Sequence, residues 1–198
     1  ASKKFISLNR NLKPHRVWWY YAMVKSGIVD QGHVSYLLPQ IDPDVYPNLL
    51  ERTSRSDKLP DTIRKDFLQD FKNHCHYREL DQVDNNWLVN FHDGIKDYYH
   101  DSLFSLIAES DQRKNLLSEK TWKAVYHMHP FFIIGNPAQA ETLRERGYYT
   151  FEDMFGVDSC DNYQEAIRLC SSVKQKKLNM WRTQVQNVYP KLEHNLMN

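Results

Sequence analysis

The stretch from residue 103 to residue 151 constrains the fold more than any other part of the chain, because apolar runs and helical segments alternate along it. Residues 103–108 (LFSLIA) and 131–134 (FFII) are short apolar runs, which predict two buried strands. Each run is followed by a segment that carries the start and stop signals of a helix. The order strand, helix, strand, helix predicts a parallel sheet covered by helices.

The first of these helices is expected between Ser118 and Pro130. Ser118 suits the N-cap, because a serine hydroxyl accepts a hydrogen bond from a backbone N–H of the first turn. Glu119 suits the first turn, where a negative charge complements the helix dipole. Glu109 directly follows the first strand, so we expect its carboxylate at the carboxyl end of the sheet.

The second helix is expected to start with Asn136 as its cap and Pro137 at its first position. Gln139 would complete a capping box, and Gly147 would end the helix. Ligands of parallel sheets bind beyond the carboxyl ends of the strands. The polar and glycine residues that the sequence places there are Glu109, Ser110, Ser118, Glu119, Lys120, Gly135 and Asn136.

A second polar cluster follows the first strand of the chain, which is predicted at residues 4–8, with its neighbour at 33–38. Pro14 suits the first turn of a helix that ends at Gly27. Backbone N–H groups at a helix start, together with arginine donors, favour an anion. We therefore expect either a phosphate or nucleotide contact here, or a solvated basic loop. Its polar residues are Asn9, Arg10, Lys13, His15 and Arg16.

Length and composition indicate one folded domain. The chain has 198 residues, of which 41% are hydrophobic and 13% aromatic, and this is enough to build a core. We expect a single Rossmann-like α/β domain over residues 1–198, with a parallel sheet flanked by helices. A helical or irregular insertion is expected at about 39–100, and a long C-terminal helix at about 162–189.

Charge and cysteine content limit the class of protein. A net charge of +1, from 26 basic and 25 acidic residues, disfavours a protein that wraps a polyanion. Three scattered cysteines and the lack of an N-x-S/T acceptor indicate the reducing cytoplasm. The longest apolar run, residues 17–24, is far shorter than the roughly 20 residues that cross a bilayer, so we expect no membrane span. The chain begins with Ala, so we expect a trimmed protein or a piece of a longer one.

The triplet His74-Cys75-His76 is the one local pattern typical of a metal site. A zinc site needs a second Cys/His pair at a suitable spacing, and the sequence has none. We therefore expect no metal and no cofactor.

Parts of the chain resemble a known group of proteins. The segments FISLNRNLKPHR, SGIVDQGHVSYL, LFSLIAES, LLSEKTWKAVYHMHPFFIIGNP and LRERGYYTF resemble phage-type glycosyltransferase-like proteins. They are also similar, more distantly, to the donor-binding C-terminal domain of GT-B glycosyltransferases such as the α-1,3-fucosyltransferases. In that family a strand with an acidic end precedes a T/S-E-K-x-W/Y helix and a P-hydrophobic-hydrophobic-G strand. The matching residues are Asn9, Arg10, Glu109, Ser118, Glu119, Lys120, Trp122, Pro130 and Gly135.

The resemblance spans residues 4–38 and 103–152 and implies a nucleotide-sugar donor, which is bound without a metal. Arg10, Lys120 and the N-terminus of the Ser118 helix would stabilise the charge that grows on the diphosphate leaving group. Glu119 would bind a ribose hydroxyl, and Glu109 would contact the donor sugar or orient Lys120. The complete expected set of donor- and phosphate-binding residues is Asn9, Arg10, Arg16, Glu109, Ser118, Glu119, Lys120, Gly135 and Asn136.

The resemblance leaves the acceptor and its general base open. In such enzymes a separate N-terminal domain supplies the base, so a missing domain or partner chain is implied. The acceptor is left open among DNA, a surface glycan and another phage or host target. His15, His127 and His129 are candidate bases by residue type alone. The acidic run that follows in the phage-type group is reduced here to Asp158-Ser159-Cys160-Asp161.

Two other functions stay open. The first is a non-catalytic phage binding or virion-associated module on the same fold. The second is a nucleic-acid-binding protein, suggested by Arg10, Lys13 and Arg16 and opposed by the neutral overall charge. A phage origin would place the chain in the host cytoplasm.

Overall fold

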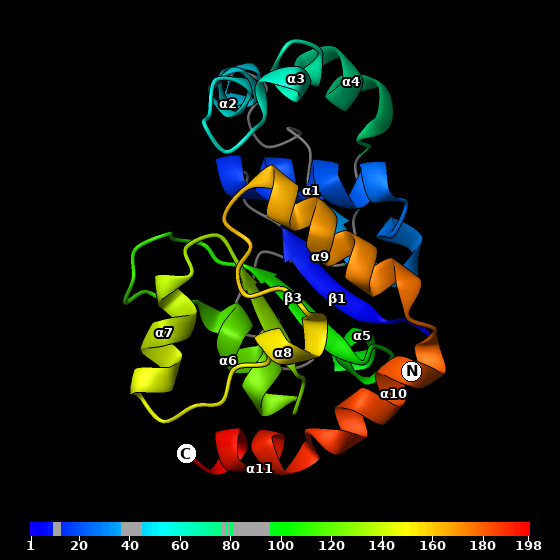
Figure 1. Ribbon diagram of the computed structural model, residues 1–198, viewed down its shortest axis with the longest axis vertical. Coiled ribbons are helices and arrows are strands. Elements are labelled where there is room, and N and C mark those ends of the chain that lie inside the picture. The colour runs from blue at the N-terminus through cyan, green and yellow to red at the C-terminus, as the bar shows by residue number, and fades with distance from the viewer. Residues whose placement is uncertain (10–12, 37–44, 77, 79, 81–95) are drawn as a thin grey trace.

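The computed structural model describes residues 1–9, 13–36, 45–76, 78, 80 and 96–198, and the following statements concern these residues (Figure 1). They form a parallel four-stranded sheet covered by helices, as the sequence predicts. The strands are β1 (Phe5–Asn9), β2 (Gly32–Tyr36), β3 (Phe104–Ala108) and β4 (Phe131–Ile134). The helices that flank or extend the sheet are α1 (Pro14–Ser26), η1 (Val29–Gln31), α6 (Glu119–Tyr126), α7 (Ala138–Glu145), α8 (Glu152–Phe155), α9 (Tyr163–Gln175), α10 (Leu178–Asn187) and α11 (Tyr189–Met197).

The strand order is β2-β1-β3-β4. In the register, Phe5 lies opposite Gly32 on one side and Phe104 on the other, and Ala108 lies opposite Ile134. The chain therefore runs from β1 outward to β2, and from β3 outward to β4 in the opposite direction. The point where the direction reverses lies between β1 and β3, and in open α/β sheets this is where ligands bind.

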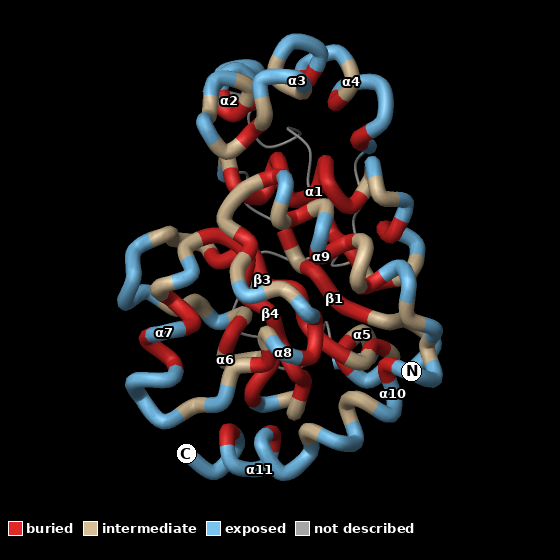
Figure 2. Tube along the Cα trace, in the orientation of Figure 1, coloured by how far each residue is buried: buried red, intermediate tan, exposed pale blue. Residues whose placement is uncertain are grey.

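The connection from β1 through α1 to β2 and the connection from β3 through α6 to β4 cover opposite faces of the sheet. This follows because both connections are expected to be right-handed and they run in opposite directions along the sheet. On the α1 face, the Nε1–H of Trp19 donates to the hydroxyl of Ser7 in β1 (3.1 Å). On the other face, Ile6 of β1 packs against the buried Tyr99. Figure 2 shows the strands as the most deeply buried part of the molecule.

Helix α1 is buried almost all the way round. It packs against α9 and α2 as well as the sheet, and every residue from His15 to Met23 is buried. This explains why the VWWYYAMV run has no polar face. The predicted end of the helix is confirmed, because Gly27 has a φ of 66° and its N–H bonds to carbonyls of the last turn.

The predicted unit from residue 104 to residue 134 is confirmed, with one boundary corrected. Ser118 caps α6, and its hydroxyl accepts from the Lys120 N–H (3.3 Å). The helix ends at Tyr126, before Pro130, because Met128 takes a left-handed conformation (φ 54°) and the His129 N–H turns back to the carbonyl of Ala124 (2.8 Å). Pro130 thus follows the helix end and does not cause it.

The insertion is helical where the structure describes it. Four helices belong to it: α2 (Val45–Ser54), α3 (Asp61–Arg64), α4 (Phe67–His74) and α5 (Lys96–His100). The first three lie together beyond α1 at one end of the molecule (Figure 1). They are held there by an aromatic contact, in which Tyr21 of α1 meets Phe67 edge to face at 5.1 Å. The possible strand at residues 87–91 lies outside the described residues.

The prediction of one long C-terminal helix is wrong. The segment forms α9, α10 and α11, and the chain is extended at Lys176 and Lys177 (ψ 131° and 159°). This break turns α10 so that Trp181 is fully buried against Phe104 and Phe155, with ring centroids 4.6 and 5.5 Å away. Burial of the tryptophan ring stabilises the protein more than an unbroken helix would. The sequence gives no sign of the break, because no Gly or Pro stands there.

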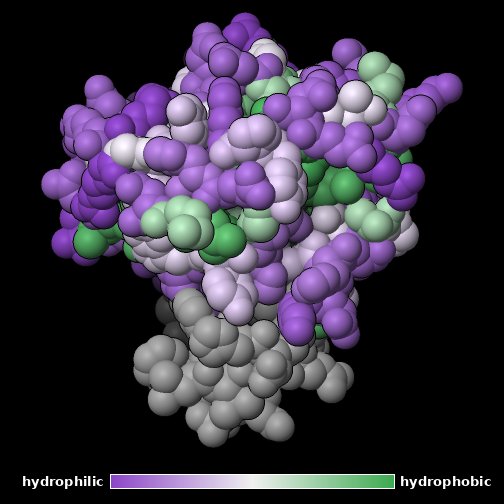
Figure 3. Space-filling view, turned by 90° about the horizontal axis from the view of Figure 1, so that it is seen from below, coloured by the Kyte–Doolittle hydropathy of each residue, from purple (hydrophilic) through white to green (hydrophobic). Residues whose placement is uncertain are grey.

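The surface formed by α10 and α11 is largely hydrophilic, with small separate apolar spots (Figure 3). Exposed apolar side chains on these helices include Met180 and Met197. Within the described ranges, no helix combines the length and the apolar character that crossing a membrane requires.

Candidate functional site

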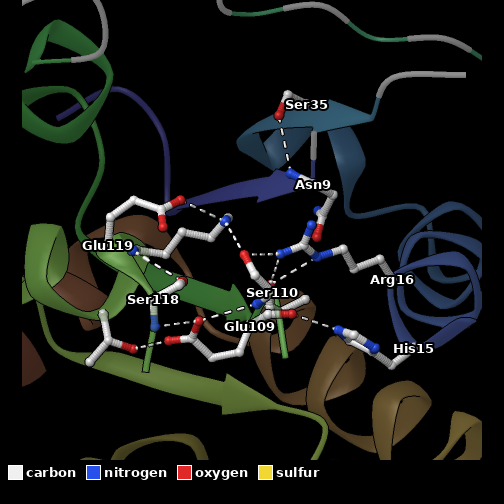
Figure 4. A network of polar contacts seen from close by, with 11 residues as sticks. Asn9, His15, Arg16, Ser35, Glu109, Ser110, Ser118 and Glu119 are labelled. Carbon is white, nitrogen blue, oxygen red and sulfur yellow. Dashed lines mark hydrogen bonds and ion pairs between the residues drawn. The ribbon is translucent and has the colours of Figure 1, made fainter. Parts of the chain in front are cut away.

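The candidate site lies at the carboxyl ends of β1 and β3, where the sheet reverses direction (Figure 4). Asn9 ends β1, and Glu109 and Ser110 follow β3. Helix α1 starts beside β1 and helix α6 follows β3, so two helix N-termini are positioned at the same edge. The backbone N–H of Asn9 donates to the hydroxyl of Ser35 at the end of β2 (3.2 Å), which ties the neighbouring strand to this edge.

Glu109 is fully buried, and its carboxylate holds the start of α6. One oxygen accepts from the N–H of Ser118 (2.9 Å) and of Ser110 (3.3 Å). The other accepts from the hydroxyl of Thr121 (2.5 Å). Both oxygens are therefore engaged within the protein, and Glu109 fixes the helix that carries Lys120.

Arg16 reaches the same edge from the first turn of α1 and is only 1% exposed. Its Nε and Nη2 donate to the carbonyl of Ala108 (3.1 and 2.9 Å). Nη2 also donates to the hydroxyl oxygen of Ser110 (3.1 Å). The guanidinium group is thus fastened to the end of β3, the strand adjacent to the one from which α1 departs.

Lys120 reaches the same hydroxyl from the first turn of α6. Its ammonium group lies 3.2 Å from the Ser110 oxygen and 3.0 Å from the Glu119 carboxylate, and its side chain is 12% exposed. Two cations from opposite faces of the sheet therefore share one neutral hydroxyl, with Glu119 as a half-exposed counter-ion.

The two cations, Arg16 and Lys120, lie beside two carboxylates, Glu109 and Glu119, so the charges described at this edge balance. Burial lowers the pKa of Lys120, and the charge of Arg16 lowers it further. Burial also lowers the pKa of Arg16 to about 10, although Glu109 and Glu119 oppose this. Helix α1 has no side-chain N-cap and no acidic residue in its first turn, so its positive end is not neutralised by the helix itself.

His15 is committed to the protein interior. Its Nε2 lies 2.7 Å from the carbonyl oxygen of Glu109, to which it donates as a neutral ring. Burial lowers the pKa of His15 to about 4, and the nearby charges of Arg16, Lys13 and Lys120 act in the same direction. The imidazole is therefore neutral near pH 7 and serves as a fixed donor.

The other two candidate bases, His127 and His129, lie around Tyr99, on the face of the sheet opposite to α1. His129 contacts the Ser105 hydroxyl (3.1 Å) and the Tyr99 carbonyl (2.9 Å). The ring of His127 stacks on that of Tyr99 at 4.4 Å. Neither histidine joins the Arg16–Lys120 group.

Gly135 and Asn136, which the sequence also places at this edge, are engaged in holding a loop. The Gly135 N–H donates to the carbonyl of Cys160 (2.8 Å), and its φ of 120° excludes other residues. The Asn136 amide donates to the carbonyl of Gln112 (2.7 Å), and its oxygen accepts from the N–H of Ala138 (3.0 Å). Both residues thus position the chain after β3 and the start of α7.

The predicted capping box of α7 is wrong. Pro137 occupies the N-cap position, and the Gln139 amide donates instead to carbonyls of the loop after β3, at Asp111 (2.7 Å), Arg113 (3.2 Å) and Leu116 (2.7 Å). These donors satisfy carbonyl groups of the loop, which has no regular backbone hydrogen bonds of a strand or helix. Sequence spacing gives no sign of this long-range contact.

Of the predicted site residues, the structure brings together Asn9, Arg16, Glu109, Ser118, Glu119 and Lys120, while Arg10 lies outside the described residues. Sequence reasoning missed Thr121, Ser7 and Ser35. A signal existed for Ser7, because it lies two residues before the predicted Asn9 and therefore on the same face of the buried strand. In the described part of the chain, no group of three or more His, Cys, Asp or Glu could hold a metal ion.

Comparison with models of protein families, with curated proteins and with solved structures finds no match for this chain. The fold class is therefore assigned from the structure alone, and a function can be proposed only from the chemistry of the site.

Proposed function

We propose that the chain binds the diphosphate of a nucleotide sugar at Arg16 and Lys120, and that it is the donor-binding domain of a GT-B-type glycosyltransferase. The observation that carries the proposal is the convergence of the two cations on the Ser110 hydroxyl, 3.1 and 3.2 Å away, at the reversal point of the sheet. Like charges in a buried setting repel; Glu109 and Glu119 offset part of that repulsion, and a bound anion would offset more of it. Both groups can donate hydrogen bonds to phosphate oxygens.

The same geometry suits a leaving group. Negative charge grows on a diphosphate as the glycosidic bond breaks, and preorganised cations and helix N-termini stabilise that charge. Lys120 keeps 12% of its side chain exposed, whereas Arg16 is buried and fastened to the Ala108 carbonyl, where it would act as a fixed donor. Glu119 is half exposed and is available to a ribose hydroxyl.

The acceptor half of the reaction is proposed to come from another domain or chain. His15 donates to a backbone carbonyl and is neutral, so it is poorly placed to take a proton from an acceptor. The acceptor is DNA or a glycan under this proposal. We place the chain in the cytoplasm, or in the host cytoplasm if a phage encodes it, because its cysteines, Cys75, Cys160 and Cys170, are free thiols.

A panel of UDP-, GDP-, TDP- and CDP-linked sugars tests the donor site by thermal unfolding. A hundredfold excess over Kd stabilises by about 2.7 kcal/mol, which raises the Tm of a chain of this size by about 5–10 °C. Lys120→Ala is expected to abolish the shift, because it removes one of the two cations that the proposal places on the diphosphate. Lys72→Ala, an exposed lysine on α4, is the matched control and should retain it. No shift with any nucleotide would overturn the proposal.

The alternative is a non-catalytic phage binding or virion-associated module on the same fold. The engagement of Glu109 and His15 within the protein favours it, because neither side chain is free for chemistry. Turnover distinguishes the two functions. The non-catalytic module is supported if a nucleotide sugar binds but is neither hydrolysed nor transferred, whichever acceptor or partner domain is supplied.

A further inference from the structure

The side-chain oxygen of Asn9 is a buried hydrogen-bond acceptor that no donor from the described part of the chain reaches. Asn9 is fully buried, and no described residue donates to its Oδ1. A buried polar atom normally has a partner, so an orphan acceptor in a candidate site indicates a group that binds there.

The orientation of the Asn9 carboxamide is set by Ser7. The Asn9 Nδ2 donates to the Ser7 hydroxyl (3.2 Å) and to the Ser7 carbonyl (3.4 Å). A carbonyl oxygen can only accept, so the nitrogen end must face Ser7. The Ser7 hydroxyl also accepts from the indole of Trp19 (3.1 Å), which holds this arrangement from α1. The oxygen end is consequently left facing away from Ser7.

The orphan oxygen belongs to the anion site. Figure 4 shows the Asn9 side chain on the same side of β1 as the guanidinium group of Arg16. The other groups that converge there, Arg16 and Lys120, are donors and suit the oxygens of a phosphate. Asn9 adds an acceptor, which a phosphate without protons cannot satisfy.

We propose that the ligand of this site carries a carbon-bound hydroxyl next to its phosphate groups, and that this hydroxyl donates to Asn9 Oδ1. The inference rests on the proposed nucleotide-sugar site and adds to it the residue that recognises one hydroxyl of the ligand and thereby rejects a bare phosphate. Asn9 is then a specificity-determining residue. It selects for hydroxylated anions because only these satisfy its oxygen.

A ligand series on the unaltered protein tests this without any risk to folding. Isothermal titration at pH 8 would compare inorganic pyrophosphate, a ribonucleoside diphosphate, its 2′-deoxy and 2′,3′-dideoxy forms, and glucose 1-phosphate beside its 2-deoxy form. At least one hydroxylated ligand should bind about tenfold more tightly than its deoxy counterpart. Equal affinities within every pair would overturn the inference, while binding of pyrophosphate would leave the anion site standing.

Asn9→Leu supplies the second arm, because leucine has a similar volume and no acceptor. The variant should lose the tenfold preference for the hydroxylated ligand and bind pyrophosphate as the unaltered protein does. Inorganic pyrophosphate still carries one proton at pH 8, so its titration also examines a P–OH group as the donor. If Asn9→Leu weakens pyrophosphate as much as it weakens the hydroxylated ligand, a P–OH group and not a hydroxyl on carbon is the partner, and the inference is wrong. If no anion binds at all, the proposed function fails first.

Discussion

Arg16 and Lys120 lie on helices that cover opposite faces of the sheet, yet Arg16 Nη2 and Lys120 Nζ approach the same oxygen, that of Ser110, to 3.1 and 3.2 Å. Neither helix alone makes this contact. It arises because β1 and β3 are neighbours and their carboxyl ends share one edge. Burial of the Lys120 charge beside Arg16 costs free energy, which Glu119 and Glu109 offset only in part, and this leads to the first prediction.

Lys120→Met should leave the free energy of unfolding unchanged or raise it by about 1 kcal/mol, because it removes a desolvated charge that faces Arg16. Nucleotide affinity should fall at least tenfold in the same variant. Urea unfolding and isothermal titration measure the two effects. Lys72→Met is the control and should change neither. A clear loss of stability in Lys120→Met would mean that this lysine is structural.

Glu109→Leu should lower the free energy of unfolding by about 3 kcal/mol, because it removes the acceptor for the Ser118 N–H and the Thr121 hydroxyl. Glu109→Gln should lower it by about 1 kcal/mol, since an amide keeps one acceptor. Glu119→Gln, at a half-exposed neighbour, is expected to stay within 0.5 kcal/mol. Amide hydrogen exchange at Ser118 should accelerate in the leucine variant alone, and equal exchange in all three would count against the anchoring role.

Acid should destabilise the protein through its two buried histidines. Burial lowers the pKa of His15 to about 4 and that of His129 to about 3. Below pH 6.5 the unfolded chain binds protons that the folded chain does not, so stability is complete above pH 6.5 and falls as the pH drops toward 4. Each histidine contributes about 1.4 kcal/mol per pH unit within this window.

Urea unfolding at pH 7, 6 and 5 measures this slope. His15→Gln should reduce this slope by the amount that uptake of one proton contributes, about 1.4 kcal/mol per pH unit. His74→Gln, at an exposed position on α4, is the matched control. If the slope does not change in His15→Gln, the imidazole is charged in the folded protein and the assignment of a neutral donor fails.

Trp181→Ala should lower the free energy of unfolding by about 3–5 kcal/mol, because its fully buried ring packs on Phe104 and Phe155. Met180 precedes it in the same helix and is half exposed, so Met180→Ala should cost less than about 0.5 kcal/mol. Similar losses for the two variants would show that α10 does not dock as described.

The residues that sequence reasoning located well are those whose local chemistry fixes a position. Ser118 was identified as a cap because hydroxyl capping depends on the next few residues alone. Gly27 was identified as a helix end for the same reason. In contrast, Gln139 and Trp181 bond or pack with segments far away in the chain, so their roles were assigned incorrectly or missed.

The sequence by itself determined the order of strands and helices from residue 103 to residue 147, the N-cap of its first helix, and the residue types that gather at the strand ends. Those features follow from hydrophobic periodicity and short-range hydrogen bonding. Only the tertiary structure decided that Glu109 faces inward to hold α6, that Arg16 crosses from α1 to Ser110, and that the Asn9 oxygen has no donor among the described residues. These three contacts depend on which strands are neighbours in the sheet. Burial of the whole core sets the order of the strands, and no single segment of the sequence contains that information.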